Sequence, residues 1–170
     1  MKEKSNVFKL AIAAMMAALA ALLIGPLAIK IMSWGYFKNI SFGVVPVIFM
    51  GMALGPFWGA GVGAAADVLG FILFPMGAYN PAFTLTYALI GCIPGLLIRG
   101  KEPKFIRVLI ATLITHVICS VGLNTAILVF MMGLSPEIMI WRAVASCGLI
   151  PLYSLLIHQA LRTLPRIVRT

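Results

Sequence analysis

The chain has 170 residues, of which 62% are hydrophobic and 10% are charged, and its mean hydropathy is +1.10. These values lie outside the range of soluble globular domains, so lipid is expected to cover much of the folded surface. The net charge of +9 would also suit a nucleic-acid-binding protein, but the basic residues stand at the ends of apolar runs, where they would meet lipid headgroups. We therefore expect a membrane protein that binds no nucleic acid.

Six apolar segments follow one another along the chain, separated by breaks that contain Gly and Pro. A helix needs about 20 apolar residues to cross the hydrocarbon core of a bilayer, and the second segment is shorter than this. The first segment leads directly into the others, which is typical of a membrane span and not of a cleavable signal. We predict an all-α bundle of six transmembrane helices in one domain over residues 1–170, at approximately 7–31, 41–54, 57–74, 83–98, 105–132 and 137–161.

The distribution of Lys and Arg predicts the orientation of this bundle. With both termini in the cytoplasm, the cytoplasmic side collects Lys2, Lys4, Lys9, Arg99, Lys101, Lys104, Arg107, Arg162, Arg166 and Arg169, whereas the outer side holds Lys30 and Lys38. Cationic residues resist translocation, so this asymmetry favours cytoplasmic termini and an even number of crossings. The expected location is the cell membrane of a prokaryote, with several passes.

Small residues recur at intervals of four in the first segment. Ala13, Ala17 and Ala21 share one stripe, with Ala14 and Ala18 beside it. Such spacing allows another helix to approach closely, which is a main source of helix association in lipid. Two interpretations stay open, packing within the bundle and docking of a partner protein.

Glycines repeat with the same spacing at Gly51, Gly55, Gly59 and Gly63. A dinucleotide-binding loop would require a preceding strand and a βαβ unit, and the sequence predicts neither. The repeat therefore indicates close packing of the second and third segments.

Asp67 is the one acidic residue inside a predicted span, and an ionisable group at such depth is a candidate functional residue. It lies ~10 Å below the outer end of its segment, and Arg142 lies roughly 8 Å deep in the last one. Further polar and aromatic residues fall at a similar level or in the outer connections: Lys30, Trp34, Tyr79, Asn80, Thr84, Tyr87 and Asn124. A polar layer in the outer third of an apolar bundle indicates a ligand pocket.

Two less specific interpretations of these residues stay open. In the first, Asp67 and Arg142 form an ion pair that only stabilises the bundle, and in the second, Trp34 and Tyr79 belong to an interfacial aromatic belt. The remaining chemistry of the chain excludes an enzyme, a metal site and a bound cofactor. There is one buried acid, the two histidines are far apart, and the three cysteines lie separately in apolar runs.

Three stretches of the sequence resemble the substrate-binding S-component of energy-coupling factor (ECF) vitamin transporters. They run from Ile40 to Ala60, with a Leu-Gly-Pro turn, from Ala66 to Gly70, and from Leu73 to Thr86, with Phe-Pro-Met-Gly-Ala-Tyr and Phe-Thr-Leu-Thr. Within that group they most resemble the folate-specific members, and the last stretch is more specific than the Leu-Gly-Pro turn, which S-components share widely. One departure is Ile24-Gly25-Pro26-Leu27, where many folate members have an Arg followed by a Phe.

The resemblance implies a six-helix protein that captures a vitamin outside the cell. It also implies docking on a transmembrane coupling subunit and two cytoplasmic ATPases, in agreement with the absence of a phosphate-binding loop in this sequence. The Ala-x-x-x-Ala docking motif of the family corresponds to Ala13 and Ala17 or to Ala14 and Ala18.

If the ligand is a folate, its parts favour different residues. One carboxylate accepts two adjacent N–H groups of a pterin, which suits Asp67, and Trp34, Tyr79 and Tyr87 are suited to stacking on the flat rings. The anionic tail favours Lys30, Lys38 or Arg142, with Asn80, Thr84 and Asn124 completing the polar contacts. The alternatives are an S-component for another vitamin or precursor, and a membrane scaffold subunit that carries no ligand.

Overall fold

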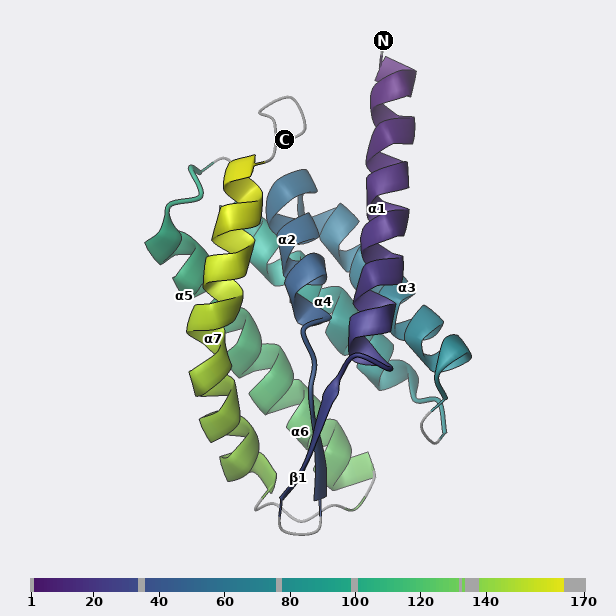
Figure 1. The fold of residues 1–170 in the computed structure, drawn as a ribbon, viewed down its shortest axis with the longest axis vertical. Coiled ribbons are helices and arrows are strands. Elements are labelled where there is room, and N and C mark those ends of the chain that lie inside the picture. Colours follow the sequence, from purple (N-terminus) through teal and green to yellow (C-terminus); the bar gives the residue numbers. More distant parts are fainter. Residues whose placement is uncertain are drawn as a thin grey trace.

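The computed structural model describes the backbone of residues 2–33, 36–75, 78–98, 101–131, 133 and 138–163, and the side chains of these residues apart from 2–5, 29–40 and 138–147. The chain forms a helical bundle with one small β-hairpin (Figure 1). The helical segments are α1 (Lys2–Ile24), α2 (Val44–Leu54), α3 (Pro56–Leu73), α4 (Pro81–Ile98), a fifth composite helix, and α7 (Ile138–Thr163). The predicted six-helix bundle is thus confirmed.

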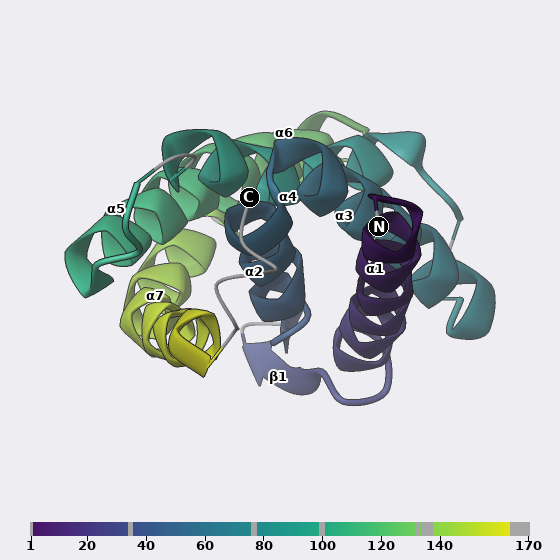
Figure 2. The same cartoon turned by 90° about the horizontal axis from the view of Figure 1, so that it is seen from above.

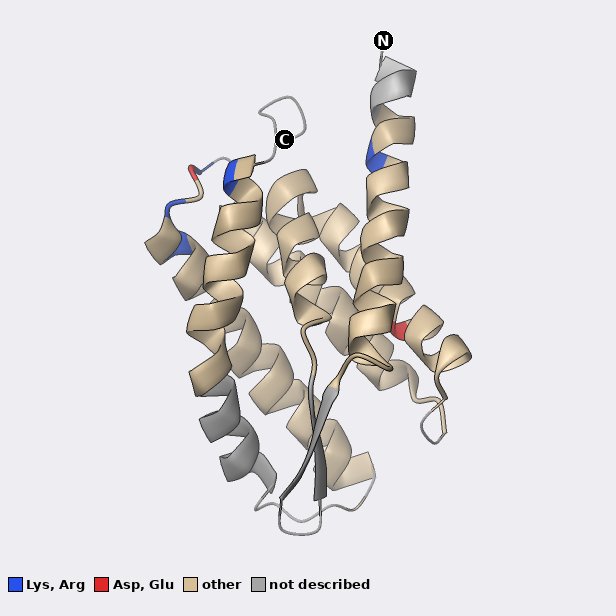
Figure 3. Cartoon of the chain, in the orientation of Figure 1, with Lys and Arg blue, Asp and Glu red and all other residues tan. Residues whose placement is uncertain are grey.

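Four of the described helical segments are long and apolar enough to cross a membrane: Asn6–Ile24, Pro56–Leu73, Pro81–Ile98 and Phe105–Met131. The start of α1 and the end of α7 lie at the same end of the bundle, and the hairpin lies at the other (Figure 1). The described Lys and Arg side chains gather toward the end that holds α1's start (Figure 3). This arrangement agrees with the charge asymmetry of the sequence.

The first segment ends earlier than predicted, at Ile24 and not at Ile31. Gly25 and Pro26 break the helix, because glycine weakens it and proline cannot donate the next backbone hydrogen bond. Residues 29–31, which were predicted to continue the helix, lie instead in β1 (Ile29–Ser33). This strand and β2 (Tyr36–Ile40) take the place of the predicted connection. The strands pair antiparallel, from Ile29 opposite Ile40 to Ser33 opposite Tyr36. Aromatic and β-branched residues suit this pairing.

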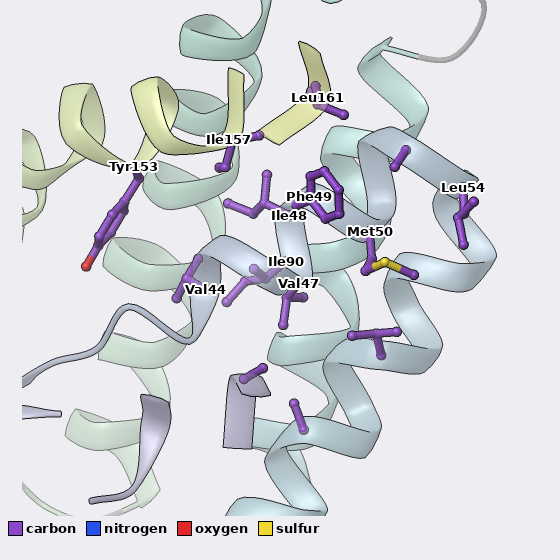
Figure 4. Packing of buried hydrophobic residues seen from close by; sticks show 14 of the residues in the cluster. Val44, Val47, Ile48, Phe49, Met50, Leu54, Ile90, Tyr153, Ile157 and Leu161 are labelled. Carbon is purple, nitrogen blue, oxygen red and sulfur yellow. The ribbon is translucent and has the colours of Figure 1, made fainter. Parts of the chain in front are cut away.

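The short helix α2 lies in the middle of the bundle. Seen from above, it stands between α1 and α7 (Figure 2), and nine of its eleven residues are buried. Figure 4 shows its Val47, Ile48 and Met50 among the core residues, close to Ile90 of α4 and Ile157 of α7. A helix that is apolar on every side is buried on every side, which explains this central position.

Helices α2, α3 and α4 meet along a glycine seam, formed by Gly51, Gly59, Gly63, Gly91 and Gly95. A Cβ atom on Gly59 would collide with the carbonyl oxygen of Gly91, and one on Gly63 would collide with the carbonyl oxygen of Tyr87. A Cβ atom on Gly95 would lie 2.7 Å from the carbonyl oxygen of Gly51. The expected packing of the second and third segments is confirmed, and α4 is an equal member of it.

The fifth helix changes its winding along its length. It begins as α5 (Phe105–Thr115), continues as the π-helix η1 (His116–Leu123), returns to a short α-helical stretch α6 (Asn124–Ala126), and ends as the π-helix η2 (Ile127–Met131). In η1 the backbone N–H of Asn124 donates to the carbonyl oxygen of Cys119, five residues back. The segment therefore crosses as one rod, but with wider turns in its second half.

Candidate ligand-binding site

A chain of hydrogen bonds joins the hairpin-facing ends of α3 and α4. The hydroxyl of Thr84 donates to Oδ2 of Asp67 over 2.6 Å, and the hydroxyls of Tyr79 and Thr84 lie 2.6 Å apart. The Thr84 hydroxyl has one hydrogen, which it gives to Asp67, so the Tyr79 hydroxyl is the donor in the second bond. The chain thus runs from Tyr79 through Thr84 to Asp67, and it fixes the direction of the carboxyl group.

This arrangement follows from the glycine seam below it. Because α3 and α4 run antiparallel and touch at Gly63 and Tyr87, the next turn of α3 brings Asp67 opposite Thr84. The Thr84 bond uses only one carboxyl oxygen, and no hydrogen bond to Oδ1 of Asp67 is seen among the described residues. That oxygen retains the capacity to accept a further hydrogen bond.

Three further contacts hold the connection between α3 and α4. The ring of Tyr79 packs on Phe71, with 5.1 Å between the ring centroids, although 44% of Tyr79 remains exposed. Oδ1 of Asn80 accepts a 3.0 Å hydrogen bond from the backbone N–H of Ala82 at the start of α4. Nδ2 of Asn80 contacts Sδ of Met131 over 3.5 Å, which links this connection to the end of the fifth helix.

The structure places the remaining predicted site residues less closely. Tyr87 lies one turn deeper in α4 and is half-buried. Asn124 lies on the fifth helix, and its buried Oδ1 has no hydrogen-bond partner among the described residues. The backbone of Lys30 lies in β1 and that of Arg142 in α7, but their side chains, like Trp34 as a whole, lie outside the described residues. The predicted site therefore contains one assembled group, Asp67 with Thr84, Tyr79 and Asn80.

The polar contacts around Tyr153 of α7 were not predicted from the sequence. Its hydroxyl donates to the carbonyl oxygen of Ser41 over 3.0 Å, and its ring stacks on His116 with 5.4 Å between centroids. Thr125, beside Asn124, is also buried without a hydrogen-bond partner among the described groups. The adjacent Asn124 and Thr125 inside an apolar run were the available signal. Polar side chains that face lipid without hydrogen bonds cost free energy, so such a pair indicates a position inside the bundle.

The two alanine pairs of α1, between which the sequence did not decide, differ in their exposure. Ala13, Ala17 and Ala21 are 7%, 3% and 0% exposed, so they pack inside the bundle. Ala14 and Ala18 lie on the exposed side of the helix. Only the second pair is accessible to a partner protein.

Comparison with known proteins agrees with this architecture. Residues 8–167 match the family model described as "ECF transporter, substrate-specific component". The chain is 34% identical over 130 residues to the folate transporter FolT of Clostridium novyi (strain NT), which covers 76% of each chain. It is also similar to the crystal structure of FolT bound with folic acid, with 30% identity and a TM-score of 0.76, over 89% of this chain and 94% of that one.

The family match extends over nearly the whole chain, from the first span to the end of α7. The members are transport subunits of bacterial membranes and not enzymes, and they work as parts of ECF complexes. The chain therefore belongs to the family of substrate-specific components of ECF transporters and is a multi-pass membrane protein.

Proposed function

We propose that this chain binds a folate at the hairpin end of the bundle, outside the cell, and delivers it inward as part of an ECF complex. The observation that carries the proposal is the combined similarity to a folate transporter and to a folic-acid-bound structure, each at 30% identity or more. The hydrogen-bonded group at Asp67 lies away from the end of the bundle at which the described Lys and Arg residues gather (Figure 3). By the positive-inside rule the hairpin end then faces outward and both termini face the cytoplasm.

In the proposed site, Asp67 accepts the N–H donors of the pterin edge, because a carboxylate can receive two parallel hydrogen bonds. Thr84 and Tyr79 orient that carboxylate and leave Oδ1 available. Tyr79 and Tyr87 are proposed to stack on the rings, with Trp34. The anionic tail is assigned to Lys30 or Arg142, and the remaining polar contacts to Asn80 and Asn124.

Direct binding tests this function. Purified protein in detergent is titrated with folic acid, and riboflavin and thiamine serve as control vitamins that lack the pterin and glutamate parts of a folate. Saturable binding of folic acid alone is the expected result, and mass spectrometry of the freshly purified protein should find a co-purified folate. Binding of another vitamin would identify that vitamin as the substrate in place of a folate. If the protein neither retains nor binds a small molecule, the scaffold alternative is favoured.

For the partners, we propose that Ala14 and Ala18 dock on the coupling subunit, which is driven by two cytoplasmic ATPases. Tryptophan at either position would hold a partner helix away, since close approach requires small residues. Uptake of labelled folic acid by cells with the whole transporter is therefore expected to fall at least tenfold for Ala14→Trp and Ala18→Trp. Binding by the isolated protein should not change.

Two controls make this docking test specific. Leu96→Trp changes a side chain of α4 that is 59% exposed, so it should preserve both uptake and binding. Ala17→Trp changes a position that is 3% exposed, so it should damage the fold and both activities. Normal uptake by the Ala14 and Ala18 variants would remove this surface from the interface.

A further inference from the structure

The fifth helix carries buried polar side chains whose hydrogen-bonding groups have no partner. Thr112 is 0% exposed, His116 is 5% exposed and Thr125 is 2% exposed. Neither hydroxyl, and neither ring nitrogen of His116, has a hydrogen-bond partner among the described residues, and the same holds for Oδ1 of Asn124. None of these residues takes part in the hydrogen-bonded group at Asp67.

By ideal helix geometry, the wide turns of η1 bring Thr112, His116 and Asn124 toward one face of the fifth helix. Thr112, His116 and Asn124 are separated by multiples of four residues, and an ideal α-helix rotates by ~40° over each such step. In the π-helix from His116 to Leu123 one more residue fits between hydrogen-bonded partners, so steps of four or slightly more stay in line. Without the π-turns, Asn124 and Thr125 would turn away from the face that holds Thr112 and His116.

Unpaired polar groups inside a membrane bundle are costly, by several kcal/mol for each group in a fully apolar surrounding. The neighbouring Thr115 shows how a threonine of the same helix avoids this cost, since its hydroxyl donates to the carbonyl oxygen of Ala111 over 2.7 Å. Thr112 and His116 have no such bond. The ring of His116 instead stacks on the ring of Tyr153, and the Tyr153 hydroxyl donates its hydrogen bond to the carbonyl oxygen of Ser41.

These side chains require a small partner that both donates and accepts hydrogen bonds. A neutral imidazole offers one donor and one acceptor, and a threonine hydroxyl offers both. No group of three or more potential metal ligands occurs among the described residues. The row formed by Thr112, His116, Asn124 and Thr125 contains no acidic residue, which argues against a bound cation. Residues one helical turn apart have Cβ atoms ~5–6 Å apart, a gap that one water molecule bridges.

We propose that the fifth helix binds ordered water along this face, with one water joining Thr112 to His116 and a second serving Asn124 and Thr125. The water completes the hydrogen bonding of the row and stabilises the wide turns. The water between Thr112 and His116 touches no residue of the proposed folate site, so it is independent of the identity of the transported ligand, and it is tested on ligand-free protein.

The first test is a double-mutant cycle on thermal unfolding in detergent. Thr112→Val and His116→Phe keep the side-chain volume and the stacked ring but remove the polar atoms, and each is expected to lower the Tm by about 2–4 °C. The double variant should lose less than the sum, because both residues hold the same water. As a control, Thr115→Val should combine additively with His116→Phe. A Tm that rises in Thr112→Val, or an additive Thr112–His116 pair, would show that the site is dry and overturn the proposal.

The second test needs no variant. Radiolysis of bound water produces hydroxyl radicals that modify the adjacent side chains. His116 of the fifth helix is 5% exposed and Met50 of α2 is 0% exposed, and a thioether reacts with hydroxyl radicals at least as fast as an imidazole. His116 is nevertheless expected to be modified faster than Met50, because the proposed water lies beside it. Modification of Met50 at a rate equal to or above that of His116 would contradict internal hydration of this face.

Discussion

Gly59→Ala is expected to lower the Tm of the purified protein by roughly 6–12 °C, or to prevent its folding. The new Cβ would collide with the carbonyl oxygen of Gly91 and would lie 2.5 Å from Cα of Gly51. These are backbone atoms, so no side chain can rotate away, and α3 must separate from α2 and α4. Overpacking of this kind costs about 3 kcal/mol or more, and each kcal/mol corresponds to about 2–4 °C in a chain of this size.

Gly61→Ala is the matched control, because it makes the same change two residues away on the same helix. A Cβ on Gly61 meets nothing within 4 Å. Alanine favours a helix over glycine by up to ~1 kcal/mol, so the Tm should stay the same or rise slightly. Thermal unfolding of both variants in the same detergent provides the measurement. Similar Tm values for Gly59→Ala and Gly61→Ala would show that the glycine seam is not tightly packed in solution.

Asp67→Ala is expected to weaken folic acid binding by about two orders of magnitude. Removal of one partner from a buried, charge-assisted pair costs ~2–5 kcal/mol, and 1.4 kcal/mol corresponds to a factor of ten in affinity. Titration of the purified variant with folic acid measures the loss. Affinity equal to that of the unchanged protein would remove Asp67 from the proposed site.

Thr84→Val separates ligand binding from helix packing. This variant breaks the same α3–α4 hydrogen bond from the other side, but it keeps the carboxylate. If Asp67 only joins the two helices, both variants should lose the same stability and the same affinity. If it contacts the ligand, Thr84→Val should lose only about tenfold, the effect of a less well oriented acceptor.

The sequence was sufficient to predict the helices, because long apolar runs with Gly and Pro between them leave few alternatives in a membrane. It was not sufficient at residues 25–40. The apolar run continues through Gly25 and Pro26, and a short run of this kind does not distinguish helix from strand. The changes of winding in the fifth helix were also out of reach, because π-turns depend on the neighbours that the helix packs against and not on local composition.

The candidate site was predictable in part, and the reason lies in helix geometry. Asp67 stood out as the single acid inside a span, and Thr84 and Tyr79 were placed near its level by counting residues. Their direct connection depends on how closely α3 and α4 approach, which Gly63 and Tyr87 determine. Counting residues gives depth but not the rotation of each helix, so it could not choose between Ala13–Ala17 and Ala14–Ala18. Their burial supports Ala14 and Ala18 as the proposed docking pair.

The short central helix also constrains how the protein is made. At ~1.5 Å per residue, the eleven residues of α2 extend about 16 Å, roughly half of the ~30 Å hydrocarbon core. A segment of this length cannot leave the translocation machinery as an independent span. It must wait until α3 and α4 have been synthesised, and then enter the bilayer with them as one unit. Biogenesis of this protein is therefore expected to be cooperative in its first half, and a ribosome paused before α4 would hold a chain whose α2 has not yet become integrated.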